Sequence, residues 1–159
     1  MGRLATSLVF LTLFAFFAQA DNVPNCVDAK GKTLPVNNAQ VLAWKITSKN
    51  QYHDRGHIKG DLVKAYSDAT HHHHWKVQIG NADTDTIEVV YNEEFGGVPQ
   101  VEPGSSIEAC GDYITSNKQS GHYPASPDGA IVHWVHMSTN PNHPSGFMVV
   151  DGTLCGQDK

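Results

Sequence analysis

The sequence is poor in cysteine and in basic residues, and both shortages exclude classes of function. Three cysteines are too few for a zinc site with four thiolate ligands. The chain has 11 Lys and Arg against 16 Asp and Glu, which gives a formal net charge of −5. Nucleic acids and anionic lipids are bound by clustered Lys and Arg, so we expect neither as a partner.

The sequence also lacks two familiar hydrolase motifs. It contains no Gly-x-Ser-x-Gly nucleophile elbow and no His-Glu-x-x-His zinc motif. These absences make an enzyme the weaker hypothesis, although a histidine can act as a general acid or base without either motif.

Long apolar runs are absent except at the start of the chain. The stretch from Leu8 to Phe17 carries no charge, follows Arg3 and ends in Ala18-Gln19-Ala20. These are the features of a secretory signal peptide, and the stretch is shorter than the roughly 20 residues that span a bilayer. We therefore expect residues 1–20 to be a cleaved signal peptide, no later membrane span, and a mature protein that is periplasmic or secreted.

Export would place all three cysteines in an oxidising compartment, where two of three normally pair. Cys26, Cys110 and Cys155 all follow the expected cleavage point. The spacing does not fix the pairing. Because Cys110 and Cys155 both lie in the half of the chain with β character, we predict a disulfide between them rather than a pair with Cys26.

Most of the chain after residue 55 has the pattern of short β-strands. Apolar and polar residues alternate in the segments 57–66, 72–79, 86–92, 105–114, 130–136 and 147–150. In 72–79 the alternation places Trp75 on the apolar face, and in 86–92 it places Tyr91 inward. Turn-forming residues separate these segments about every ten residues. This predicts a mainly β domain over residues 56–156, a small five- to six-stranded barrel of the oligonucleotide/oligosaccharide-binding (OB) type, preceded by an N-terminal arm and one helix over residues 21–55.

The N-terminal part has its own local signals. Proline and glycine interrupt residues 21–35, so we expect an extended arm there. Asn37 or Asn38 can cap a helix whose apolar residues continue to about Asn50. Residues 53–56 are expected to form a turn.

The 10 histidines are unevenly distributed, and four of them, His71 to His74, are consecutive. On a strand His72 and His74 share one face, whereas His71 and His73 point to the other. Neutral imidazole suits zinc, copper and nickel, so His72 and His74 could bind a metal ion together. His57 on a neighbouring strand could add a third ligand.

A second group of histidines stands near the end of the chain. It lies in residues 129–136, with the sequence GAIVHWVH, and in residues 140–146, with the sequence NPNHPSG. On a strand His133 and His136 point to opposite faces, so we do not expect them to chelate one ion. His143 lies between prolines in a loop, where a constrained backbone can aim one side chain at a ligand.

These two segments resemble the closing signature of a family of small exported bacterial proteins that is catalogued only as a domain of unknown function. The signature is a glycine, an aliphatic pair, His-Trp-x-His, a polar turn and His-Pro-x-Gly. The resemblance extends back through Gly-Asp-Tyr at 111–113, Tyr-Asn at 91–92 and the strand at 72–79. It covers about residues 56–152.

The resemblance implies a shared polar site, although the family has no established activity. Carried over position by position, that site consists of His72, Asn92, His133, Trp134, His136 and His143. Two positions depart from the family pattern. Tyr91 stands in place of a histidine, and His73-His74 stands in place of Gln-Arg.

Three functions fit these residues. The favoured one is a binding module that holds a small polar ligand, a glycan or a peptide, against a face of histidine, asparagine and tryptophan side chains. The first alternative is a zinc or copper protein, with His72, His74, His136 and His143 as its ligands. The second is a hydrolase with a histidine general acid or base, for which the predicted site supplies no carboxylate partner.

Overall fold

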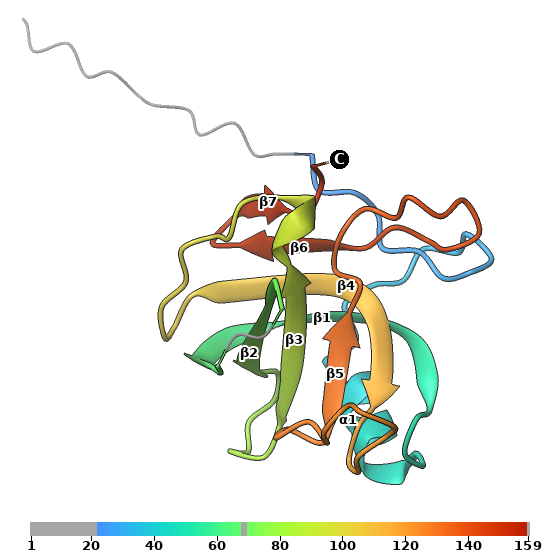
Figure 1. Ribbon diagram of the computed structural model, residues 1–159, viewed down its shortest axis with the longest axis vertical. Coiled ribbons are helices and arrows are strands. Elements are labelled where there is room, and N and C mark those ends of the chain that lie inside the picture. Colours follow the sequence, from blue (N-terminus) through green and yellow to red (C-terminus); the bar gives the residue numbers. More distant parts are fainter. Residues whose placement is uncertain (1–21, 68–69, 159) are drawn as a thin grey trace, which may run out of the picture.

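The computed structural model describes residues 22–67 and 70–158, and Figure 1 shows a barrel of strands with a helix at one end. The expected signal peptide, residues 1–20, lies outside the described residues. Within the described part of the chain, no helix is long and apolar enough to cross a membrane.

The topology of the described residues is that of a closed barrel with two added strands. The elements are α1 (Asn38–Thr47), β1 (His53–Ala65), β2 (His72–Gln78), β3 (Thr86–Asn92), the short 3₁₀ helix η1 (Glu93–Phe95), β4 (Ser106–Thr115), β5 (Ala130–His133), β6 (Phe147–Val150) and β7 (Thr153–Cys155). The strand order is β1-β2-β3-β5-β4-β6-β7, and β1 also pairs with β4. The first five strands therefore form a barrel, in which β3 and β5 run parallel. This confirms the predicted mainly β, OB-like barrel with one N-terminal helix; β7 was not predicted.

The inward faces of the strands build the core of the barrel. Trp75 of β2, Tyr91 of β3, Tyr113 of β4 and Val132 of β5 are all nearly inaccessible to solvent. Their neighbours along each strand point outward, because successive side chains of a strand lie on opposite faces. The alternation in the sequence predicted the positions of Trp75 and Tyr91 correctly; the facing of Tyr113 and Val132 was not predicted.

Helix α1 closes one end of the barrel (Figure 1). The side chain of Asn37 caps the helix by accepting a hydrogen bond from the backbone N–H of Gln40 at 3.1 Å. Val41 is buried against the barrel core. The predicted helix is confirmed, and it ends at Thr47, slightly earlier than expected.

Two predicted segment assignments are wrong. Residues 53–56, expected to be a turn, begin β1 and pair with residues 111–114 of β4, so the barrel starts earlier than expected. Pairing with a distant strand overrides the local turn propensity of these residues. The segment 130–136, expected to be a strand throughout, leaves the sheet after His133, where Trp134 adopts a φ of 55°.

The predicted disulfide is also wrong. Cys110 pairs with Cys26, and their Cα atoms are 5.6 Å apart. Cys110 points from β4 to the outside of the barrel, where it packs with Cys26 and Phe147. Cys155 packs against the barrel core on the other face of the sheet, which keeps it away from Cys110. The disulfide therefore ties the N-terminal arm to the barrel wall.

Candidate functional site

The register of the strands places several polar residues on the outer wall of the barrel. His133 of β5 pairs with Asp112 of β4, which in turn pairs with Arg55 of β1. His72 of β2 pairs with Asn92 of β3, and the ring centroids of His72 and His133 are 5.5 Å apart. Tyr91, Tyr113 and Val132 are the neighbours of Asn92, Asp112 and His133 along their strands, and all three fill the core, so these polar side chains project outward.

The chain after β5 folds back over this wall. Trp134 has a positive φ of 55°, which is uncommon for a bulky residue, and the strand ends there. Two glycines make room for the loop 134–146. A Cβ atom at Gly146 would lie 2.0 Å from the carbonyl oxygen of Trp134, and one at Gly111 would lie 2.2 Å from that of His133. Only glycine permits both of these approaches.

The loop adds three rings to the wall. The ring centroid of Trp134 lies 4.2 Å from that of His143 and 5.4 Å from that of His136. Phe95 of η1 stacks on His136 with a centroid distance of 3.7 Å, and His136 is only 4% exposed. The structure thus brings all the residues of the predicted polar site to one surface. We call this surface the histidine wall; it consists of His72, Asn92, His133, Trp134, His136 and His143.

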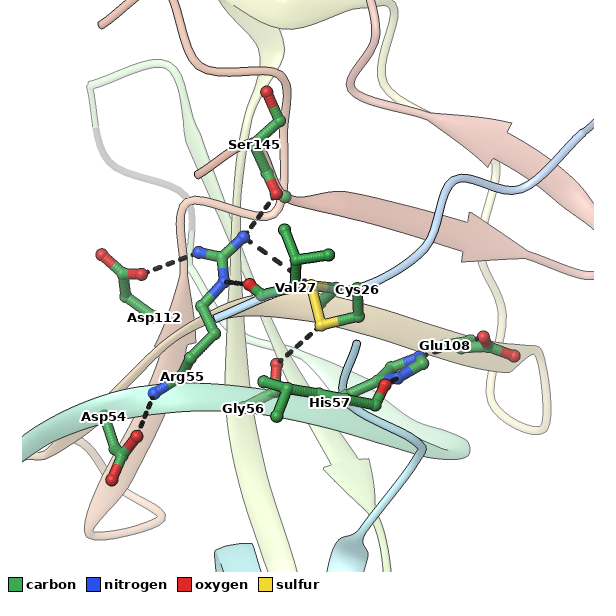
Figure 2. Close-up of a disulfide and its surroundings, with 12 residues drawn as sticks. Cys26, Val27, Asp54, Arg55, Gly56, His57, Glu108, Asp112 and Ser145 are labelled. Carbon is green, nitrogen blue, oxygen red and sulfur yellow. Dashed lines mark hydrogen bonds and ion pairs between the residues drawn. A yellow bond between two sulfur atoms is a disulfide. The ribbon is translucent and has the colours of Figure 1, made fainter. Parts of the chain in front are cut away.

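A buried ion pair anchors the wall to the barrel. The guanidinium group of Arg55, with its side chain 6% exposed, contacts Asp112 at 2.7 Å and donates to the carbonyl oxygens of Ser145 and Val27 (Figure 2). Nε2 of His143 lies 2.8 Å from the other carboxylate oxygen of Asp112. Asp112 therefore joins strand β1 to the loop that carries His143.

Neither Arg55 nor Asp112 was predicted to belong to the site. Arg55 fell in the segment that was expected to be a turn. Asp112 belongs to the Gly-Asp-Tyr triplet that was included in the resemblance. Its position next to Gly111 was the available signal, because a charged residue there faces outward beside a close backbone approach.

Two histidines of the wall, His133 and His136, have lowered pKa values. Burial, followed by repulsion from His72 and His136, lowers the pKa of His133 to about 4, against a weaker opposing effect of Asp112. Burial also lowers the pKa of His136, and nearby His143 adds to this effect. At neutral pH these rings are therefore uncharged, and each has one donor and one acceptor nitrogen.

The free energy of unfolding is expected to fall as the pH is lowered from 6.5 to 4. Unfolded His133 takes up a proton near its ordinary pKa of 6.5, whereas the folded protein takes it up only near a pKa of about 4. Acid therefore favours the unfolded state over this range, by at most about 3 kcal/mol from this residue. Urea unfolding at pH 6.5 and pH 4 would measure the loss, and a His133→Gln variant should lose less. Equal losses in both proteins would contradict the shift.

Three histidines of the run at 71–74 bind carboxylates. Glu93 accepts from Nδ1 of His71 at 2.6 Å and from Nε2 of His73 at 2.8 Å. The bond to Glu93 raises the pKa of His71, and the two histidines lower the pKa of Glu93. Nδ1 of His74 lies 2.5 Å from Glu88. These contacts give the run a structural role in fastening β2 to β3 and η1.

The metal hypothesis gains no support from this geometry. Among the described residues, no three His, Cys, Asp or Glu side chains are placed to hold a metal ion. Of the four predicted ligands, His74 and His143 contact carboxylates, whereas Nδ1 of His72 and of His136 contacts a backbone carbonyl. His57, considered as an additional ligand, contacts Glu108 and the carbonyl oxygen of Leu34.

Asn92 supports the wall in a second way. Its side-chain oxygen accepts a hydrogen bond from the backbone N–H of Glu94 at 3.0 Å and so caps η1, which presents Phe95 to His136. The side-chain NH₂ group of Asn92 is left as a donor for other partners.

Comparison with known protein families finds no match for the chain, and comparison with curated proteins finds none either. The resemblance to the exported bacterial family therefore stays a prediction, and the function has to be argued from the site itself.

Proposed function

We propose that the protein is an exported binding module that holds a small polar ligand, a glycan or a peptide, on the histidine wall. The observation that carries the proposal is the gathering of Trp134 with His136 and His143 beside the pair of His72 and His133. An aromatic ring provides an apolar surface on which a ligand can pack. Neighbouring groups that both donate and accept hydrogen bonds then fix the orientation of that ligand.

Export is supported by two independent features. The start of the sequence has the charge, length and small residues of a signal peptide. The Cys26–Cys110 disulfide is of the kind that forms and persists in oxidising compartments. Both features favour a protein that works in a periplasm or outside the cell.

A hydrolase is the second candidate, favoured by the contact between Asp112 and His143. Asp112 provides the carboxylate partner that was missing among the predicted site residues. Such a carboxylate can orient a histidine that acts as a general acid or base. However, Arg55 also pairs with Asp112 at 2.7 Å. The guanidinium group offsets the negative charge that would make the imidazole a stronger base, so this pair supports binding better than catalysis.

The change Trp134→Ala is expected to weaken ligand binding about tenfold or more, because it removes the aromatic contact surface of the wall. The measurement is a parallel screen of both proteins on glycan and peptide arrays. Tyr123→Ala is the matched control, since it removes an aromatic side chain that is 80% exposed on a different loop. Array binding that survives Trp134→Ala unchanged would contradict the proposed site.

A further inference from the structure

The charges of the histidine wall are already paired within the protein. Asp112 contacts both Arg55 and His143, at 2.7 and 2.8 Å. Glu88, nearly buried on β3, contacts His74 and the hydroxyl group of Ser126. A charged ligand would have to leave water and compete with these existing pairs, which is costly.

Hydrogen bonds to the protein fix which ring nitrogens of the wall are acceptors. Nδ1 of His72 lies 2.8 Å from the carbonyl oxygen of Thr70, and Nδ1 of His136 lies 2.8 Å from that of Met137. A carbonyl oxygen can only accept, so both Nδ1 atoms carry the hydrogen. In the neutral ring, Nε2 is then the acceptor.

His143 differs from these two histidines, because its acceptor nitrogen is buried. Its Nε2 donates to Asp112, which leaves Nδ1 as the acceptor of the neutral ring. Nδ1 is buried and has no hydrogen-bond partner among the described residues. Because Nδ1 is closed to solvent, it is not offered to a ligand at the surface, and leaving it unsatisfied costs about 1–3 kcal/mol.

The wall also contains donors and one broad apolar surface. Trp134 has an indole N–H, and Asn92 has its side-chain NH₂ group, because its oxygen is used by Glu94. The indole ring of Trp134 lies beside His143 and His136. A ligand that matches this set has groups that both donate and accept, together with an apolar C–H face.

A peptide fits this surface less well than a sugar. Extended peptides are commonly bound by adding a strand to an open sheet edge. The histidine wall lies over β2, β3, β5 and β4, each of which has a paired strand on both sides in the closed barrel. Strand addition is therefore blocked here, and binding has to depend on side chains.

We infer that the ligand of the histidine wall is a neutral sugar, whose ring stacks on Trp134 and whose hydroxyl groups donate to the imidazole nitrogens of His72 and His136. Hydroxyl groups suit the wall because each can donate and accept, and the absence of charge avoids a desolvation penalty. This inference rests on the proposed function and specifies the class of ligand.

The test is binding of the purified protein to three arrays: neutral oligosaccharides of glucose, mannose, galactose and N-acetylglucosamine; acidic oligosaccharides that contain uronic or sialic acid; and peptides. We expect binding to neutral oligosaccharides. His72→Phe should weaken that binding about tenfold, because the ring stays and the acceptor is lost. The matched control is His122→Phe, the same change at an exposed histidine of another loop, which should leave binding unchanged.

The remaining outcomes separate this inference from the proposed function. Peptide binding that depends on Trp134, without sugar binding, would overturn the sugar inference and leave the binding module in place. Binding to acidic oligosaccharides alone would overturn the neutral ligand. Equal loss in the His72 and His122 variants would overturn the role of the His72 acceptor. Binding to none of the three arrays would overturn both proposals.

Discussion

Replacing Asp112 with Asn is expected to lower the free energy of unfolding by about 3 kcal/mol, because it leaves a buried guanidinium group without its counter-charge. The side chain of Arg55 is 6% exposed, and its contact with Asp112 is 2.7 Å long. The carbonyl oxygens of Ser145 and Val27 keep Arg55 hydrogen-bonded, but they carry no negative charge. Urea unfolding of the two proteins at one pH would measure the loss.

Glu108→Gln on the same strand is the control for this prediction. Glu108 is also a partly exposed outward carboxylate, at 21% against 28% for Asp112, but its partners are Lys59, whose side chain is 57% exposed, and Nε2 of His57. A pair with an exposed lysine is worth about 1 kcal/mol or less, and the amide of Gln can still hydrogen-bond to Nε2 of His57, so this variant should unfold almost as the parent does. Equal losses in the two variants would show that Arg55 does not depend on Asp112.

The same substitution should change the histidine wall. In Asp112→Asn the charge that holds His143 is lost, so the His143 ring should become more mobile and its NMR signals should shift more than those of His57. His57 is the reference for this comparison, because it contacts Glu108 and not Asp112. If the variant loses stability but the NMR signals of His143 do not change, Asp112 stabilises the fold without positioning His143.

Reduction of the Cys26–Cys110 disulfide is expected to cost about 4 kcal/mol of stability. The two cysteines are 84 residues apart, and a cross-link across so long a segment removes much of the conformational freedom of the unfolded chain. Urea unfolding with and without a reductant measures the effect. The experiment is best done in a Cys155→Ser variant, so that only the disulfide responds to the reductant.

Peptide mapping of the unreduced protein provides the control for the connectivity. A cross-linked peptide that contains Cys26 and Cys110 is expected, together with a Cys155 peptide that can be alkylated. A cross-link between Cys110 and Cys155 would contradict the fold of the N-terminal arm. A change in stability below about 1 kcal/mol on reduction would show that the arm contributes little to the folded state.

The disulfide and the Arg55 pair belong to one region of the molecule. Nη2 of Arg55 lies 3.7 Å from the sulfur of Cys110, and Nε of Arg55 donates to the carbonyl oxygen of Val27, the residue after Cys26 (Figure 2). Loss of the disulfide would therefore loosen one of the groups that hold the guanidinium. We expect the two effects to be non-additive, because residues in one network couple.

The strand pattern and the inward residues of the core were predictable from the sequence, because they depend on local periodicity. Alternation along β2 and β3 identified Trp75 and Tyr91 as inward residues, and both are buried. The asparagine cap and apolar residues before residue 48 identified α1. Each of these features follows from a repeat of two or of 3.6 residues within a single segment.

The candidate site was predictable only in part. The motif residues His133, Trp134, His136 and His143 were selected from the sequence, and the structure places them on one surface. How they meet was not predicted, since the strand was expected to continue through residue 136. The actual turn depends on Gly146, whose missing side chain lets a distant segment reach the backbone at Trp134.

The sequence by itself determined the mainly β barrel, its N-terminal helix, its core and the residue types available for a site. Only the tertiary structure decided which partners those residues have. Arg55 and Asp112 are 57 positions apart, Asp112 and His143 are 31 apart, and the paired cysteines are 84 apart. Such contacts are set by strand pairing and by the face on which each side chain emerges, and a local sequence pattern carries no information about a segment so far away.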